Sequence, residues 1–210
     1  MHLAYISDKS LQNLVPNELD IVDRIRKRRA PAPLQPLDRA LLYSPPVADG
    51  WNSFLGAIRT KTTIDAGLRE LMICRVAVCN DAWYEWDDHA PLALQADVSA
   101  AALDLIKNKS LASVSKDDLK KSGLGDKELV ALKITDDMTH GLKLRDDAFE
   151  ELRAHFNERQ IVEIIATISC YNCVSRFLVA LNVGEKNDAE MDSDHTARAL
   201  EFSNQSPVNS

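Results

Sequence analysis

Residues 81–94, DAWYEWDDHAPLAL, contain the residue types and spacing best suited to proton-transfer chemistry. Glu85 and His89 are four positions apart, so on a helix their side chains lie on one face. A carboxylate beside an imidazole holds one tautomer and raises its basicity, which prepares a general acid or base. Such a pair alone is more often a surface contact, so the neighbouring residues must decide between the two interpretations.

Aromatic residues favour a half-buried setting for this pair. Tyr84 and Trp86 flank Glu85, and Trp86 lies three positions before His89. Three aromatic residues within four positions suggest a half-buried wall, in which ionisable groups have perturbed pKa values.

Two charged residues interrupt the apolar segment just upstream. Glu70 and Arg75 fall within AGLRELMICRVAVCN at 66–80. Because apolar residues surround Arg75 on both sides, we expect it to be buried and therefore paired. An interhelical ion pair is its more usual role, and substrate binding is the alternative.

A C-x-x-C pair, Cys170 and Cys173, lies in ISCYNCVSRF. It could be a redox centre, half of a metal site, or two small residues in a buried helix. An apolar helix raises thiol pKa values, so neither cysteine is well placed as a reactive thiolate. We interpret the stretch as core packing, with Asn172 as its residue best placed to reach a pocket.

The elements that must position these residues are helices, and the predicted fold class is all-α. Asn17 with Asp20, Asp65, and Ser99 are candidate helix starts, and Pro91 predicts a kink or break near Ala90. Apolar spacing and breakers predict helices over 18–29, 37–44, 47–60, 66–80, 82–96, 100–108, 127–141, 145–156 and 159–183.

The predicted organisation is an N-terminal helix with a proline-rich lead-in (1–37), a helical domain (38–185) and a polar tail (186–210). The polar region 107–127 separates two halves of the domain, about 38–106 and 126–185, each centred on a long buried helix. The tail is expected to hold one short helix. The basic run RIRKRR at 24–29 is expected to be a solvated helix face.

Composition excludes several classes of partner. The 210 residues carry a formal charge of −7, which favours neither nucleic acid nor an anionic membrane. Four cysteines without an apparent signal peptide predict reduced thiols and a cytoplasmic location. The apolar stretch at 161–183 contains charged and amide residues, so it suits a buried helix better than a membrane span.

The segment LRELMICRVAVCNDAWYEWDDHAPLALQADVS at 68–99 resembles the signature region of the carboxymuconolactone decarboxylase family, in the AhpD-like superfamily. The resemblance extends over about 38–185, through SPPVADGWNSFLGAI upstream and the segment 129–183 downstream. It implies an AhpD-like helical fold and a symmetric homo-oligomer.

The peroxidase-reductase branch of that superfamily carries Glu, eleven residues, Cys, two residues, Cys, three residues, His. Counted from Glu70, the cysteine positions hold Ala82 and Glu85, and the histidine position holds His89. Cys79 lies one helical turn too early to replace them. The resemblance therefore implies the decarboxylase-like branch, in which a cofactor-free pocket acts by proton transfer on a small carboxylated or lactone-like compound.

In that chemistry, loss of CO₂ leaves an enolate that the protein stabilises and protonates. Decarboxylation, isomerisation, dehydration and cyclisation all share this enolate, and the sequence does not choose among them. His89 is the predicted acid/base, with Glu85 or Glu70 as its partner. The predicted catalytic residues are thus His89, Glu85 and Glu70, and the predicted substrate-binding residues are Tyr84, Trp86, Arg75 and Asn172.

Two alternatives remain: a thiol peroxidase or disulfide reductase using Cys170 and Cys173, and a non-catalytic assembly module. His140 and His155 lie in polar surroundings and His195 lies in the tail, so surface positions are expected for them. No paired Cys/His spacing occurs, so neither a metal site nor a cofactor is predicted.

Overall fold

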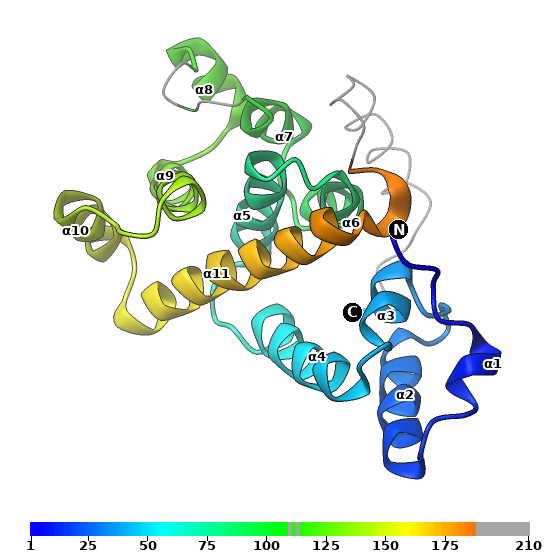
Figure 1. The fold of residues 1–210 in the computed structure, drawn as a ribbon. Coiled ribbons are helices and arrows are strands. Elements are labelled where there is room, and N and C mark those ends of the chain that lie inside the picture. The colour runs from blue at the N-terminus through cyan, green and yellow to red at the C-terminus, as the bar shows by residue number, and fades with distance from the viewer. Residues whose placement is uncertain (109–110, 112–113, 188–210) are drawn as a thin grey trace.

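The computed structural model describes residues 1–108, 111 and 114–187, and its regular elements there are all helices (Figure 1). This confirms the predicted all-α class. The elements are α1 (Asp8–Leu11), α2 (Pro16–Arg29), α3 (Pro36–Leu41), α4 (Pro45–Thr60), α5 (Ala66–Cys79), α6 (Trp83–Gln95), α7 (Ala100–Ile106), α8 (Lys116–Ser122), α9 (Asp126–His140), α10 (Asp146–His155), α11 (Glu158–Leu181) and the 3₁₀ turn η2 (Val183–Glu185).

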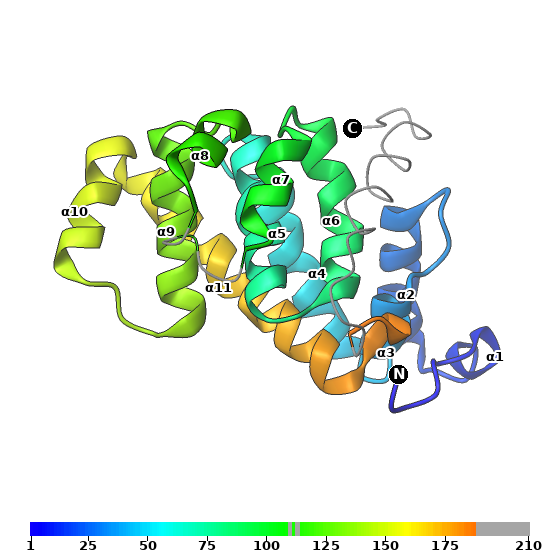
Figure 2. The same ribbon diagram turned by 90° about the horizontal axis from the view of Figure 1, so that it is seen from above.

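Helix α5 lies at the centre of the molecule and contacts α6, α7, α9 and α11 (Figures 1 and 2). Asp65 caps it as predicted, because its carboxylate accepts a hydrogen bond from Leu68 N at 3.2 Å. Nearly every side chain from Gly67 to Val78 is buried, including Glu70 and Arg75. A helix that is covered on all sides can present charged groups to several neighbours at once.

Helix α6 runs antiparallel beside α5 and continues through Pro91 to Gln95. Of the kink or break predicted near Ala90, the break therefore does not occur. Ala90 and Ala93 are fully buried, and close packing on α5 holds the backbone helical around the proline.

Helix α11 is the longest element and crosses α4, α5, α6 and α9 (Figure 1). Asn157 caps its start, and Asn182, in the left-handed conformation at φ 48°, ends it two residues before the predicted Gly184. By length and composition alone α11 could cross a membrane, but half of its most apolar window is buried in this fold. Core helices of globular proteins share that property.

Helices α2 and α3 lie at the end of the molecule opposite α9 and α10, and α4 runs from them toward the middle, where it contacts α11 (Figures 1 and 2). Helix α2 begins at Pro16 without a side-chain cap, so the predicted start through Asn17 and Asp20 is wrong: the proline itself begins the helix. The basic run at 24–29 is largely exposed, as expected, with only Arg29 half-buried among its basic residues. Arg24 binds Asp49 at 2.7 Å, and Arg29 binds the buried Asp38 at 2.8 Å.

The core divides into two clusters of buried side chains rather than into two separate halves. The larger joins α2–α5 with α9–α11, and the smaller joins α5 and α6 with α7 and Leu132. The region predicted as a linker contains helix α8. The predicted helix in the tail lies outside the described residues, and the proposed domain bounds stay a prediction.

Candidate functional site

A buried carboxylate–imidazole pair joins α5 to α6. His89 Nδ1 lies 2.6 Å from Glu70 Oε2, and only 7% and 3% of the two residues is exposed. Of the two partners considered for His89, the structure therefore provides Glu70. A contact this short with the carboxylate fixes the Nδ1–H tautomer, which leaves Nε2 to accept or deliver a proton.

Glu70 stays ionised although it is buried. Burial alone would raise its pKa, but the charge and hydrogen bond of His89, together with Arg59 and Arg69, outweigh burial and lower the pKa of this carboxyl. Arg69 Nε lies 3.4 Å from Glu70 Oε1. The site therefore contains a charged acceptor that bonds to His89 and lies near the positive charges of Arg59 and Arg69.

Tyr171 of α11 completes the wall around His89. The two rings meet edge to face, with their centroids 5.0 Å apart and their planes at 87°. The hydroxyl of Tyr171 is buried and has no hydrogen-bond partner among the described residues. Burial raises its pKa, and the charges of Glu70 and Glu85 act in the same direction. A buried hydroxyl without a partner is costly in a folded protein, so this one is available to a ligand or to water.

Glu85 lies in the same helix as His89 but bonds to α11. Both of its carboxyl oxygens lie within 3.1 Å of Ser175 Oγ, and 1% of the residue is exposed. Burial raises the pKa of Glu85 well above its ordinary value, and the one hydrogen bond from Ser175 only partly offsets this. The pKa values of Glu70 and Glu85 thus shift in opposite directions, lowered for the first and raised for the second.

Arg59, near the end of α4, is the half-buried cation of this region. Its charge lowers the pKa of both Glu70 and Tyr171. Within the described residues its guanidinium makes no hydrogen bond or ion pair. A guanidinium held near a buried site without an acidic partner suits recognition of a carboxylate from outside the protein.

Arg75, which was predicted to bind substrate, has a structural position instead. Its guanidinium is fully buried and bonds to the carboxylate of Asp136 on α9, with Nη2–Oδ2 at 2.8 Å. Nη1 donates to the carbonyls of Ile106 and Asn108 at 2.6 Å. These bonds tie α5 to α9 and to the end of α7, as the interhelical ion-pair interpretation expected.

Asn172 also lies in a hydrogen-bond network within the protein. Its amide donates to Thr139 Oγ1 at 3.0 Å and to the carbonyl of Ile168 at 3.1 Å. Its oxygen accepts from Asn80 at 3.1 Å and from Arg176 at 2.7 Å. All its polar atoms are thus used by protein groups.

The two flanking aromatic residues face different neighbours. Trp86 is fully buried in the smaller core cluster, with Lys107 over its ring at 5.7 Å, and its indole N–H has no partner among the described residues. Tyr84 is 7% exposed and packs against Gly184 in the larger cluster. The two rings therefore support α6 from opposite sides.

The C-x-x-C pair is not a core pair as predicted. Cys170 is buried, but Cys173 is exposed, so the pair lies at the edge of the buried face of α11. Burial, with the neighbouring Cys173 and Glu85, raises the pKa of Cys170 to about 12. A thiol with this pKa is a poor nucleophile near neutral pH.

Sequence reasoning missed three residues of this site. Tyr171 stands between Cys170 and Cys173. Ser175 lies on a helix far from Glu70 in the chain, and Arg59 lies at the end of the preceding helix, 11 positions before Glu70. Each is a common residue type without a local motif. Only the crossing of α11 over α5 and α6 places Tyr171 and Ser175 at the acidic residues.

Residues 45–108 match the Carboxymuconolactone decarboxylase family. This match covers α4 to α7 and includes Glu70, Glu85 and His89. Over these helices the chain is similar to this family, and its fold is the AhpD-like helical fold. No curated protein matches the sequence significantly.

Similar solved structures cover nearly the whole chain. An uncharacterized peroxidase-related protein from Silicibacter sp. TM1040 is 16% identical over 88% of this chain and 94% of its own, with a TM-score of 0.67. The apo debrominase Bmp8 is 14% identical over 94% and 96%, with a TM-score of 0.63. A cysteine-to-alanine variant of Bmp8 in complex with 2,3,4-tribromopyrrole gives the same identity and TM-score, over 94% and 95%. At these identities the likeness concerns the fold.

Proposed function

We propose that this protein is a cofactor-free enzyme that transfers a proton to or from a small carboxylated, enolisable compound, with decarboxylation as the reaction that fits the site best. The observation that carries the proposal is the buried Glu70–His89 pair, placed against the unpartnered hydroxyl of Tyr171. The family match over the same helices supports this class of chemistry.

The groups around His89 suit the steps of such a reaction. The guanidinium of Arg59 binds a second carboxylate of the substrate, the one that stays in the product. When the carbon–carbon bond to the leaving carboxylate breaks, CO₂ departs and the electron pair moves onto the conjugated carbonyl oxygen. His89 then delivers its proton to the carbon that carried the carboxylate, and Glu70 stabilises the imidazolium before this transfer.

The developing enolate oxygen needs hydrogen-bond donors, and the site offers two neutral ones. The Tyr171 hydroxyl keeps its proton because burial raises its pKa, and the Glu85 carboxyl keeps its proton for the same reason. Neutral donors in a dry site stabilise an oxyanion without first having to lose a counter-ion. The raised pKa of Glu85 thus favours the protonated carboxyl, which can donate a hydrogen bond to the enolate oxygen.

The thiol alternative receives less support. Ala82 and Glu85 occupy the positions where the reductase branch carries its cysteines, and Cys170 titrates too high for ready attack. The debromination named for Bmp8 is therefore not proposed for this chain.

The test is turnover of a panel of small carboxylated lactones and 3-oxo acids, followed by proton NMR. The wild-type chain should convert at least one member with release of CO₂. His89→Gln should lower kcat by about 100- to 10,000-fold, the range that general acid–base catalysis contributes. His155→Gln, a half-buried histidine on α10, is the matched control and should retain full activity.

Arg59→Gln separates binding from chemistry, because removal of a contact to the unreacting carboxylate raises KM more than it lowers kcat. Full activity of His89→Gln toward a substrate of the wild type would refute the proposal. We also propose that the working form is a homo-oligomer, which light scattering of the purified chain would test.

A further inference from the structure

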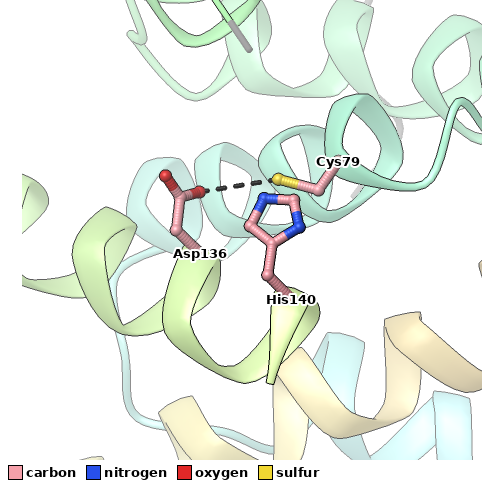
Figure 3. A group of neighbouring side chains, drawn as sticks. All are labelled: Cys79, Asp136 and His140. Carbon is pink, nitrogen blue, oxygen red and sulfur yellow. Dashed lines mark hydrogen bonds between the residues drawn. The ribbon is translucent and has the colours of Figure 1, made fainter. Parts of the chain in front are cut away.

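A second cluster of reactive side chains lies away from the Glu70–His89 pair, where the end of α5 meets α9 (Figure 3). Cys79 is the last residue of α5, and Asp136 and His140 lie four positions apart on α9, so they share a face. The thiol, carboxylate and imidazole donor atoms all lie within 4.8 Å of one another. The Cys79 thiol donates to Asp136 Oδ1 at 3.5 Å.

We propose that Cys79, Asp136 and His140 form a binding site for a thiophilic divalent cation, with Zn²⁺ as the ion that fits best. Zn²⁺ accepts sulfur, nitrogen and oxygen ligands together in tetrahedral geometry. With metal–ligand bonds of about 2.0–2.3 Å, the ligand atoms of such a site lie about 3.3–3.8 Å apart. The Cys79–Asp136 separation of 3.5 Å already meets this requirement.

To bring all three donor atoms to metal-binding distances, the side chain of His140 has to move most. His140 is exposed, whereas Cys79 and Asp136 are half-buried at the contact between helices. A small rotation of the imidazole brings its nitrogen to the position that a cation needs. The ion replaces the proton of the thiol–carboxylate contact, because a coordinating cysteine binds as the thiolate.

Arg75 holds the carboxylate ligand in place. It donates to Oδ1 of Asp136 through Nε at 2.5 Å and to Oδ2 through Nη2 at 2.8 Å. A carboxylate oxygen has two lone pairs, so Oδ2 keeps one for a metal ion, and Oδ1 regains one when the Cys79 thiol gives up its proton. Partners of this kind orient metal ligands in known sites.

The arrangement differs from that of a cysteine nucleophile. In a nucleophilic Cys–His pair the carboxylate orients the imidazole, and the imidazole contacts the thiol. Here Asp136 bonds to the thiol itself, and all three donor atoms converge on one point (Figure 3). Three donor atoms that face one another match a cation site. A carboxylate beside a thiol opposes formation of the thiolate unless a cation lies between them.

The site is separate from the proposed catalytic centre. Cys79 lies nine residues beyond Glu70 on α5, which corresponds to about 13.5 Å along a helix. Three protein ligands leave a fourth position for water or another small ligand. A bound ion would link the end of α5 to the end of α9, next to the buried Arg75–Asp136 pair.

The test is metal binding by the tag-free chain after removal of bound metal with a chelator. Zn²⁺ is titrated calorimetrically, and Co²⁺ is titrated by absorption, because a cobalt–thiolate bond gives a charge-transfer band. We expect one ion per chain and a thiolate band. Cys79→Ser should abolish the band, and Cys79→Ser and His140→Gln should each weaken Zn²⁺ binding by at least about 100-fold, the upper end of the loss caused by outer-shell changes.

Cys173→Ser and His155→Gln are the matched controls, since they remove an exposed cysteine and a half-buried histidine elsewhere. They should bind Zn²⁺ as the wild type does. Circular dichroism checks that every variant keeps its helices. The proposal is overturned if the wild type lacks saturable one-to-one binding, or if Cys79→Ser and His140→Gln bind as tightly as the controls.

Discussion

Substitution of Glu70 by Gln tests the buried pair most sharply, because it removes the charge and keeps the shape. The wild-type carboxylate accepts from His89 at 2.6 Å with 3% of the residue exposed. A hydrogen bond to a charged group contributes about 1.5–3 kcal/mol to stability, and a neutral one about 0.5–1.5 kcal/mol. The amide of Glu70→Gln still accepts, so the expected loss in unfolding free energy is the difference, about 1–2 kcal/mol at pH 7.

The loss should depend on pH in a defined direction. The folded pKa of Glu70 lies below its ordinary value of 4.5, so its charge stabilises the fold above pH 4.5. That contribution disappears as the pH falls through the lowered folded pKa. The difference in unfolding free energy between wild type and Glu70→Gln should therefore be largest near neutral pH and decrease in acid.

Urea unfolding followed by circular dichroism at a series of pH values measures this difference. For a chain of this size the loss corresponds to a decrease in Tm of about 2–8 °C. Glu150→Gln is the control: its side chain is 69% exposed and lies 3.6 Å from Arg153, and such surface pairs contribute about 0–1 kcal/mol. Equal stability of Glu70→Gln and wild type at all pH values would refute the assigned charge state.

Three further predictions concern the residues around this pair. Glu85→Gln should gain stability relative to wild type as the pH rises above 4.5, because the folded pKa of Glu85 is raised and ionisation of the buried wild-type acid destabilises the fold. If urea unfolding gave a difference in unfolding free energy that did not change with pH, it would contradict this. Gly184→Ala should lower the unfolding free energy by about 2–5 kcal/mol in the same assay, because φ at Gly184 is +78° and a Cβ atom would lie 2.0 Å from the Tyr84 ring. A loss below about 1 kcal/mol would contradict this contact. Replacement of Cys170 and Cys173 by Ala should leave turnover unchanged, and loss of activity in a folded double variant would favour the thiol alternative.

Much of the fold could be predicted from local sequence. Asp65 and Ser99 cap their helices where the pattern placed them, because an N-cap depends on a few consecutive residues. The course of α6 through Pro91 could not be predicted in this way. Tertiary packing of Ala90 and Ala93 decides it, and no window of sequence contains that information.

The candidate site, like the fold, could be predicted only in part from local sequence. The expected acid/base, His89, lies in a buried pair with one of its two predicted partners, Glu70. Tyr171 could not be recognised, because it becomes a site residue only where the distant helix α11 crosses α5 and α6, and Arg59 is an arginine without a local motif. The cluster of Cys79 with Asp136 and His140 is a stronger case, because Cys79 and Asp136 are 57 positions apart and no local spacing of metal-ligand residues connects them.

The measurement that tests the central proposal most directly is the position of deuterium in the product after turnover in D₂O. If His89 delivers the proton inside a closed site, the wild-type product carries one deuterium at the carbon that lost CO₂, on a single face. His89→Gln should form little of this product. Deuterium spread equally over both faces in the wild-type product would show that solvent protonates a released intermediate, and this result would contradict the role assigned to His89.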